Sequence, residues 1–215
     1  FKNYINFIDR KTLVIFISQS GETVDVLDAV KMAKEKKSKV LAIVNVQGSS
    51  LTREVDGFIL MNAGPEIGVL STKTYTSQLA ILSLISYSVN KNYQKGLKAL
   101  KALIKYVYAL TSKNTRDYLK KLSRNLRYTE HIYTMGRNLE YPTALEAALK
   151  IKEVSYIHAE GFAGGELKHG NIALIEKGTP CIVFIPKKDN EEIMSNMMEV
   201  KARGAYIIGI GSKNN

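Results

Sequence analysis

Short apolar runs alternate with amphipathic stretches along the first part of the chain. Apolar runs occupy residues 13–17, 40–44 and 58–60. Amphipathic patterns that predict helices extend from residue 24 to about 36 and from about 72 to 89. Continuous apolar runs of this length are typical of strands that are buried on both faces of a parallel sheet. Their alternation with helices predicts an α/β fold.

The same alternation begins again after residue 130. A strand is predicted at 131–135 and is closed by Gly136. Pro142 is tolerated in the first turn of a helix that we expect to reach about residue 154. Further strands are predicted at 172–175, 181–185 and 206–210, and a helix at about 191–203 that stops at Gly204.

The two halves repeat one order of elements: strand, loop, helix and strand, at residues 13–44 and again at 181–210. We interpret them as related units, although two generic βαβ units could resemble each other by coincidence. The predicted organisation is a first unit at 1–90, a basic helical linker at 91–127 and a second unit at 128–215. Both are expected to be doubly wound parallel sheets with helices on both faces, three layers in all. Both look incomplete, because such sheets normally continue beyond their outermost strands.

The net charge of +11 is concentrated in the predicted linker, where residues 91–127 hold 11 basic side chains and one acid. A basic helix could bind nucleic acid, an anionic membrane or an acidic partner. Apolar residues recur at helical spacing between the lysines, and no nucleic-acid motif accompanies them. We therefore favour a solvated connecting helix and expect no nucleic-acid partner.

Other features limit the class of protein. The longest apolar run, at 79–89, is interrupted by serines and is too short to span a bilayer, so no membrane association is expected. No secretory leader is visible, although the sequence begins with Phe1. The single cysteine, Cys181, excludes an intramolecular disulfide and any multi-cysteine zinc site. We expect a cytoplasmic protein.

The segment Ser-Gln-Ser-Gly-Glu-Thr at 18–23 joins a predicted buried strand directly to a helix. A helix start offers free N–H groups and a positive dipole end, and ligands bind at the carboxyl ends of parallel strands. The hydroxyls of Ser18, Ser20 and Thr23 add donors, and Gly21 allows close approach of an anion. The segment lacks the P-loop lysine and the GxGxxG pattern. Phosphate binding and ordinary helix capping both remain open here.

Two further groups of polar residues could carry chemistry. Glu146, Lys150 and Glu153 share one face of the predicted helix at 142–154, either as a surface ion-pair ladder or as a carboxylate base beside an ammonium group. The glycine-rich segment 157–170 contains His158, Glu160, Glu166 and His169, whose spacing fits no HExxH-type metal site. We therefore do not expect a metal; a histidine there is structural or an acid–base group.

The sequence resembles the isomerase part of the glutamine–fructose-6-phosphate amidotransferase (glucosamine-6-phosphate synthase) family, which is built from two sugar isomerase (SIS) domains. The stretches that carry the resemblance are ISQSGET (17–23), GSSLTRE (48–54), NAGPEIGVLSTKTYTSQL (62–79) and 140–175, which begins EYPTALEAALK. The last is specific to amidotransferase-type proteins with two SIS domains. SQSGET alone would indicate only an SIS phosphosugar site.

The resemblance assigns roles to individual residues. Glu153 matches the base that moves a proton between C1 and C2 of the sugar, and Lys150 matches a lysine that assists at a sugar hydroxyl. His169 matches the ring-opening histidine, which in the family serves the neighbouring subunit and so implies a homodimer. The phosphosugar-binding positions are Ser18, Gln19, Ser20, Thr23, Val69 and Ser71.

The resemblance also implies the reaction and its partners. The sugar phosphates would be fructose 6-phosphate, glucose 6-phosphate and glucosamine 6-phosphate, with no cofactor. The family's glutaminase domain, first SIS strand and imine-forming C-terminal lysine have no counterpart in this sequence, which suggests a partial chain. Such a chain is expected to be inactive alone in the full reaction. Asn171 and Pro65 depart from the family's proline and threonine, and the second phosphate loop is replaced at 186–190, so only the first unit should hold sugar phosphate.

A second hypothesis is a non-catalytic SIS module that binds phosphosugars for regulation. A pure sensor needs only the phosphate loop. The presence of Glu153, Lys150 and His169 together therefore favours the enzyme.

Overall fold

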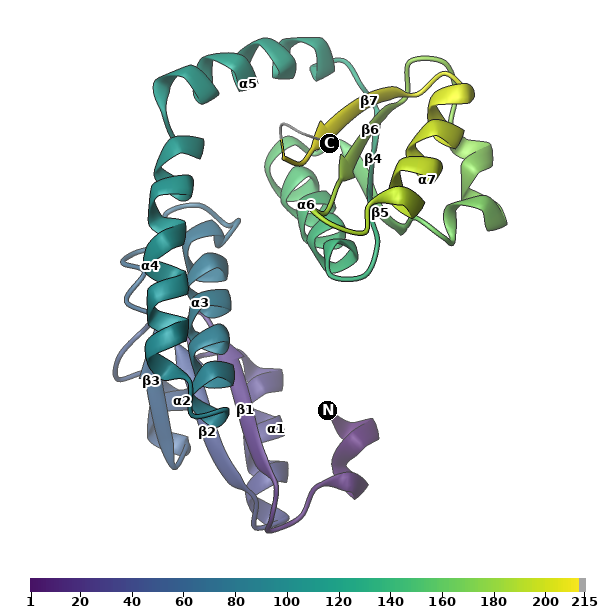
Figure 1. Ribbon diagram of the computed structural model, residues 1–215. Helices are drawn as coiled ribbons and strands as arrows, with labels where there is room; N and C mark the ends of the chain where they lie inside the picture. Colours follow the sequence, from purple (N-terminus) through teal and green to yellow (C-terminus); the bar gives the residue numbers. More distant parts are fainter. Residues whose placement is uncertain (213–215) are drawn as a thin grey trace. The chain divides into compact units, whose positions relative to one another are not determined.

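The computed structural model describes residues 1–212, and the chain divides into two compact units between Ala109 and Leu110. The division falls inside the segment predicted as a linker at 91–127. The elements of the first unit are η1 (Lys2–Phe7), β1 (Leu13–Ser18), α1 (Val24–Glu35), β2 (Lys39–Val44), α2 (Ser50–Glu54), β3 (Gly57–Leu60), α3 (Thr72–Val89) and α4 (Tyr93–Leu110) (Figure 1).

The first unit contains a parallel three-stranded sheet in the order β1-β2-β3. Val40, Ala42 and Val44 of β2 pack with Val30 and Ala33 of α1 in one buried cluster. Ile43 points to the opposite face and is also fully buried. Figure 1 shows α1 and α3 on opposite sides of this sheet. Burial on both faces explains why the strands are continuously apolar instead of alternating.

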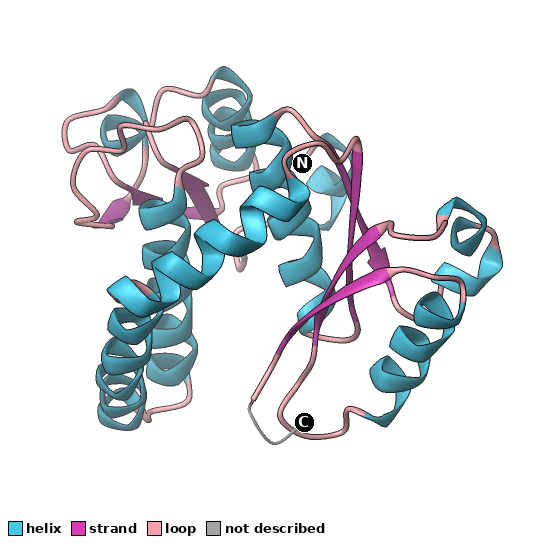
Figure 2. Cartoon of the chain, turned by 90° about the horizontal axis from the view of Figure 1, so that it is seen from above, coloured by secondary structure: helices cyan, strands magenta, loops and turns pink. Residues whose placement is uncertain are grey.

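The second unit consists of α5 (Lys113–Leu126), β4 (His131–Gly136), α6 (Glu140–Ser155), β5 (His158–Ala163), η2 (Leu167–His169), η3 (Asn171–Leu174), β6 (Pro180–Phe184), α7 (Glu191–Ala202) and β7 (Tyr206–Ile210). Its four strands form a parallel sheet in the order β5-β4-β6-β7, drawn in magenta in Figure 2.

Helices cover both faces of the second sheet. Along β4, Ile132 packs with Ala148 of α6, whereas Met135 packs with Ile193 of α7. Thr134 points to the α6 side, where its hydroxyl donates to the Ala144 carbonyl at 2.6 Å. Figure 1 shows α6 and α7 on opposite sides of the sheet. The predicted α/β class with parallel, doubly wound sheets is therefore confirmed.

Two predictions of local structure are wrong. Residues 172–175 were expected to form a strand, but 171–174 form the 3-10 helix η3, from which Ile172 packs against the core beside Ile175. A run of four apolar residues does not distinguish a strand from another buried segment. Strand β5 was missed, because its sequence HAEGFA has no β-branched residue.

The basic segment forms two helices. Ser112 is the N-cap of α5, and its hydroxyl accepts the Thr115 N–H at 3.3 Å. Gly96 of α4 lies against the Tyr87 ring of α3, which no larger residue at 96 would allow. In the part of the chain that the structure describes, no helix is long and apolar enough to cross a membrane.

Candidate functional site

The loop at 18–23 follows the carboxyl end of β1 and is organised by its own hydroxyl groups. Ser18 is 7% exposed, and its Oγ accepts the Gly21 N–H at 3.0 Å. The Thr23 Oγ1 lies 3.3 Å from the same Ser18 oxygen. The Ser20 Oγ accepts the Glu22 N–H at 3.2 Å. These bonds gather three hydroxyls and two backbone amides in one short turn.

The helix that follows this loop is not capped by a side chain. Thr23 is the N-cap of α1, but its hydroxyl makes no capping bond. Its backbone carbonyl accepts the N–H groups of Val26 and Leu27 at 3.0 and 3.1 Å. The ordinary capping alternative therefore does not describe this loop. The Val26 N–H is thus used within the helix, whereas the N–H groups of Val24 and Asp25 lie at the positive end of the helix dipole, which suits an anion.

A neighbouring loop holds the glycine turn in place. Gly21 has φ +69°, and Ser49 packs directly against its Cα, so a side chain at position 21 would collide with it. The Gly21 carbonyl accepts the Leu51 N–H at 3.0 Å. The Glu22 carboxylate accepts the Ser50 N–H at 2.7 Å, and this hydrogen bond is the main reason that the pKa of Glu22 lies below its ordinary value.

This support from Ser49 and Ser50 was not assigned any role from the sequence. The only available signal was the stretch at 48–54, whose role depends on a contact with a distant loop. An open hollow of about 540 Å³ lies beside the turn, lined by Gln19, by residues 45–47 and by Asn62, Gly64 and Pro65. Of the predicted phosphosugar-binding residues, Gln19 is the one that lines this hollow.

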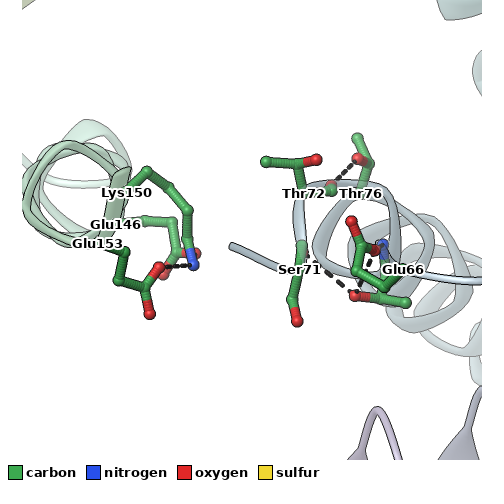
Figure 3. A network of polar contacts seen from close by, with 8 residues as sticks. Glu66, Ser71, Thr72, Thr76, Glu146, Lys150 and Glu153 are labelled. Carbon is green, nitrogen blue, oxygen red and sulfur yellow. Dashed lines mark hydrogen bonds and ion pairs between the residues drawn. The ribbon is translucent and has the colours of Figure 1, made fainter. Parts of the chain in front are cut away.

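The segment before α3 carries two more predicted residues. Val69 is 87% exposed, and Ser71 has a left-handed backbone with φ 52°. Glu66 organises this segment: its Oε2 accepts both the N–H and the hydroxyl of the buried Thr74, at 3.1 and 3.2 Å (Figure 3). Burial opposes ionisation of Glu66, but these hydrogen bonds prevail and lower its pKa. Glu66 therefore fixes the backbone beside Ser71.

In the second unit, α6 brings Glu146, Lys150 and Glu153 together as the helical spacing predicts. Lys150 Nζ lies 2.7 Å from Glu153 Oε2 and 3.4 Å from Glu146 Oε1 (Figure 3). The three side chains are 23–28% exposed. Burial disfavours the charged ammonium, but the two carboxylates prevail and raise the pKa of Lys150. At neutral pH this face of α6 holds an ammonium group between two carboxylates.

His169 lies exposed on η2, an element separate from α6. Cys181 lies inside β6 and is 1% exposed. Burial raises the pKa of its thiol to about 12, which leaves almost no thiolate at neutral pH. Among the described residues, no group of three or more metal-ligating side chains is close enough to hold an ion.

Comparison with known proteins places this geometry in a family. The family model of the SIS domain matches residues 1–87 and 125–215. The chain belongs to the SIS domain family. Both SIS segments thus include a parallel sheet, and the segment from 88 to 124 between them contains most of α4 and α5.

This SIS chain is similar to curated proteins named glutamine–fructose-6-phosphate aminotransferase (isomerizing). The relative from Pyrococcus horikoshii is 43% identical over 97% of this chain and 35% of its own length. The relative from Thermococcus kodakarensis is 44% identical over 97% of this chain and 36% of its own length. The SIS chain therefore spans about a third of the length of these relatives. The resemblance identified from the sequence motifs is confirmed.

Solved structures agree. The C-terminal domain of glucosamine-fructose-6-phosphate aminotransferase from Francisella tularensis has a TM-score of 0.83 and 38% identity, covering 94% of this chain and 59% of that chain. Tagatose-6-phosphate ketose/aldose isomerase from Escherichia coli has a TM-score of 0.76 at 17% identity, covering 99% of this chain and 61% of that chain. The second similarity shows the SIS fold alone.

Proposed function

We propose that this SIS chain is the isomerase portion of a glucosamine-6-phosphate synthase. It would bind fructose 6-phosphate and convert it, with ammonia released from glutamine elsewhere in the whole protein, to glucosamine 6-phosphate. The observation that carries the proposal is the hydroxyl-lined turn at 18–23, which precedes a helix without a side-chain cap. The chain that contains this turn is 43% identical to a protein named glutamine–fructose-6-phosphate aminotransferase.

Phosphate recognition rests on hydrogen-bond donors without a lysine. The hydroxyls of Ser18, Ser20 and Thr23 bond within the turn. Each hydroxyl can rotate to donate to a phosphate oxygen, and the Ser18 and Ser20 oxygens can do so while they accept from the amides of Gly21 and Glu22. The first-turn N–H groups of α1 supply further donors along the helix axis. Gln19 would hold the sugar side, because it borders the adjoining hollow. Val69 and Ser71 would also line the sugar.

Proton transfer is assigned to Glu153, with Lys150 as its partner. An aldose–ketose interconversion removes a proton from one carbon and returns it to the next, which one carboxylate can do. The Lys150 ammonium, held 2.7 Å from Glu153, stays charged and can donate to the sugar oxygen on which negative charge develops. His169 would open the sugar ring in the partner subunit of a homodimer.

The alternative is a phosphosugar-binding module without catalysis. The presence of the Lys150–Glu153 pair favours the enzyme, because phosphate binding does not need it. The two functions differ in one measurable property. An isomerase exchanges the carbon-bound proton of the sugar with solvent, whereas a binding module leaves it in place.

The experiment measures binding on this chain and proton exchange on the whole protein. Calorimetry with fructose 6-phosphate should show binding that Ser20→Ala/Thr23→Ala weakens about 10-fold or more, since hydrogen bonds to a charged group are worth about 1.5–3 kcal/mol each. In the whole protein, which would supply the imine-forming lysine implied by the resemblance, solvent deuterium incorporation into fructose 6-phosphate, followed by NMR, should be lost in Glu153→Gln while binding remains. Unchanged affinity in the double variant would contradict the phosphate site. Binding without exchange in the whole wild-type protein would favour the regulatory module.

A further inference from the structure

Two histidines that lie far apart in the sequence meet at the amino ends of neighbouring strands. His131 is the first residue of β4 and His158 the first of β5, and the parallel register makes them direct partners. Their Nδ1 atoms are 3.2 Å apart, and their rings stand nearly perpendicular, at 83°. Neither residue has a role in the proposed isomerisation. Both are exposed.

The separation of the two nitrogens matches the bite of a transition metal. Zinc binds imidazole nitrogen at about 2.0–2.1 Å with tetrahedral angles, which places two ligating nitrogens about 3.3–3.4 Å apart. The observed separation of 3.2 Å is close to that value. Without a metal, one Nδ1 carries a proton and donates to the other. A metal ion would take the place of that proton, because both Nδ1 atoms must be unprotonated to bind it.

The surroundings favour a cation and leave room for its water ligands. Both histidines line a solvent-open cavity of about 680 Å³, together with Glu130 and Glu176. Tyr133 lines the same cavity. Its pKa is raised first by burial and then by the negative charges of Glu160 and Glu176, so the cavity lies near negative charge. No positively charged side chain lines this cavity within the described residues.

We propose that His131 and His158 bind one divalent transition-metal ion through their Nδ1 atoms, with water completing its coordination. Zn²⁺ and Ni²⁺ suit the site because imidazole is among their preferred ligands. With two protein ligands, the site binds more weakly than a four-ligand structural zinc site. The ion would clamp β4 to β5 and so stabilise the second unit, because a ligand bound only by the folded state raises its stability.

Spacing along the sequence predicted no metal site, because it compared only residues within one segment. His158 shares a segment with His169, Glu160 and Glu166, yet strand register pairs it with His131 from 27 positions earlier. The metal proposal does not depend on the proposed function, because His131 and His158 have no role in that function.

The test uses the full chain, stripped with a chelator, at pH 7.5. Calorimetry with ZnCl₂ and with NiCl₂ should show one site, and the thermal midpoint should rise with metal concentration. His131→Gln and His158→Gln should each weaken binding at least 10-fold. The chain has three histidines, so His169→Gln is the matched control and should bind as the wild type does.

A second measurement keeps the test independent of variant folding. In the wild-type chain, NMR of the three imidazoles should show two that shift on metal addition and one that does not. Far-UV circular dichroism checks that the variants remain folded. No binding of either metal at millimolar concentration would overturn the proposal. So would an equal loss in His169→Gln, or metal-induced shifts in the imidazole of His169 instead.

Discussion

Replacing Gly21 with alanine should damage the phosphate turn for two separable reasons. The first is conformational: φ of +69° costs a residue with a Cβ about 1–2 kcal/mol. The second is steric. A Cβ at this position falls 2.6 Å from the Cβ of Ser49 and 3.0 Å from Cγ2 of Val44, and it overlaps the Ser49 hydroxyl. Overpacking of this kind costs about 1–3 kcal/mol. The expected loss is therefore about 2–5 kcal/mol.

The chain contains a matched control. Gly48 has φ +77°, but no atom lies within 4 Å of the position that its Cβ would occupy. Gly48→Ala should therefore carry the conformational cost alone, about 1–2 kcal/mol. Ser49→Gly should recover part of the loss when it is combined with Gly21→Ala, because it removes the two Ser49 atoms that collide and leaves only the contact with Val44.

Two compact units can unfold separately, so one global transition would mix their stabilities. Hydrogen exchange measured by mass spectrometry on peptides from residues 13–51 reports the first unit locally. Gly21→Ala should accelerate exchange in these peptides far more than Gly48→Ala, and peptides from β4 to β7 should not change. Equal acceleration in the two variants would refute the steric part of the reasoning. Failure of Ser49→Gly to rescue would refute the assigned contact.

Three further results are expected. Cys181 should react with a thiol reagent at pH 8 much more slowly than free cysteine, because burial raises its pKa to about 12; fast labelling in the folded chain would contradict this. The pKa of Glu199 is lowered from its ordinary value of 4.5 mainly by Lys168, so this carboxylate stabilises the fold at pH values above 4.5, and the stabilisation is lost as the pH falls through the lowered pKa. Glu199→Gln should therefore destabilise the chain at pH 7 but not in strong acid, as urea titrations at both pH values would show. Gly136→Ala should lower the thermal midpoint, because a Cβ there overlaps the Glu140 backbone at the start of α6; an unchanged midpoint would exclude that overlap.

Local pattern predicted the elements whose burial is uniform. The run at 13–17 became β1, and the helical pattern at 72–89 became α3 with the same ends. These signals are readable because a strand between two helical layers must be apolar on both faces. The face shared by Glu146, Lys150 and Glu153 was equally readable, since helical spacing alone brings residues three and four apart together.

Pattern failed where a distant partner decides the conformation. The segment 158–163 looked like a glycine-rich loop, yet it pairs with β4 along its whole length. Gly161 fits there because the backbone of Leu145 in α6 passes close to it. Residues 172–175 looked like a strand, but 171–174 form a 3-10 helix. Whether such an apolar run pairs with a strand depends on the rest of the fold, which a single sequence does not reveal.

The sequence by itself determined the α/β class, most strands and helices, the resemblance to the SIS family and the candidate residues of the turn and of α6. The spacing of residues along a helix and the apolar runs of the strands carry that information. Tertiary structure alone decided that Ser49 and Ser50 support the turn at 21–22, and that His131 faces His158. Both contacts depend on strand register and on segments brought together where the paired strands begin or end. Residues so distant in the sequence meet only when the sheet is assembled.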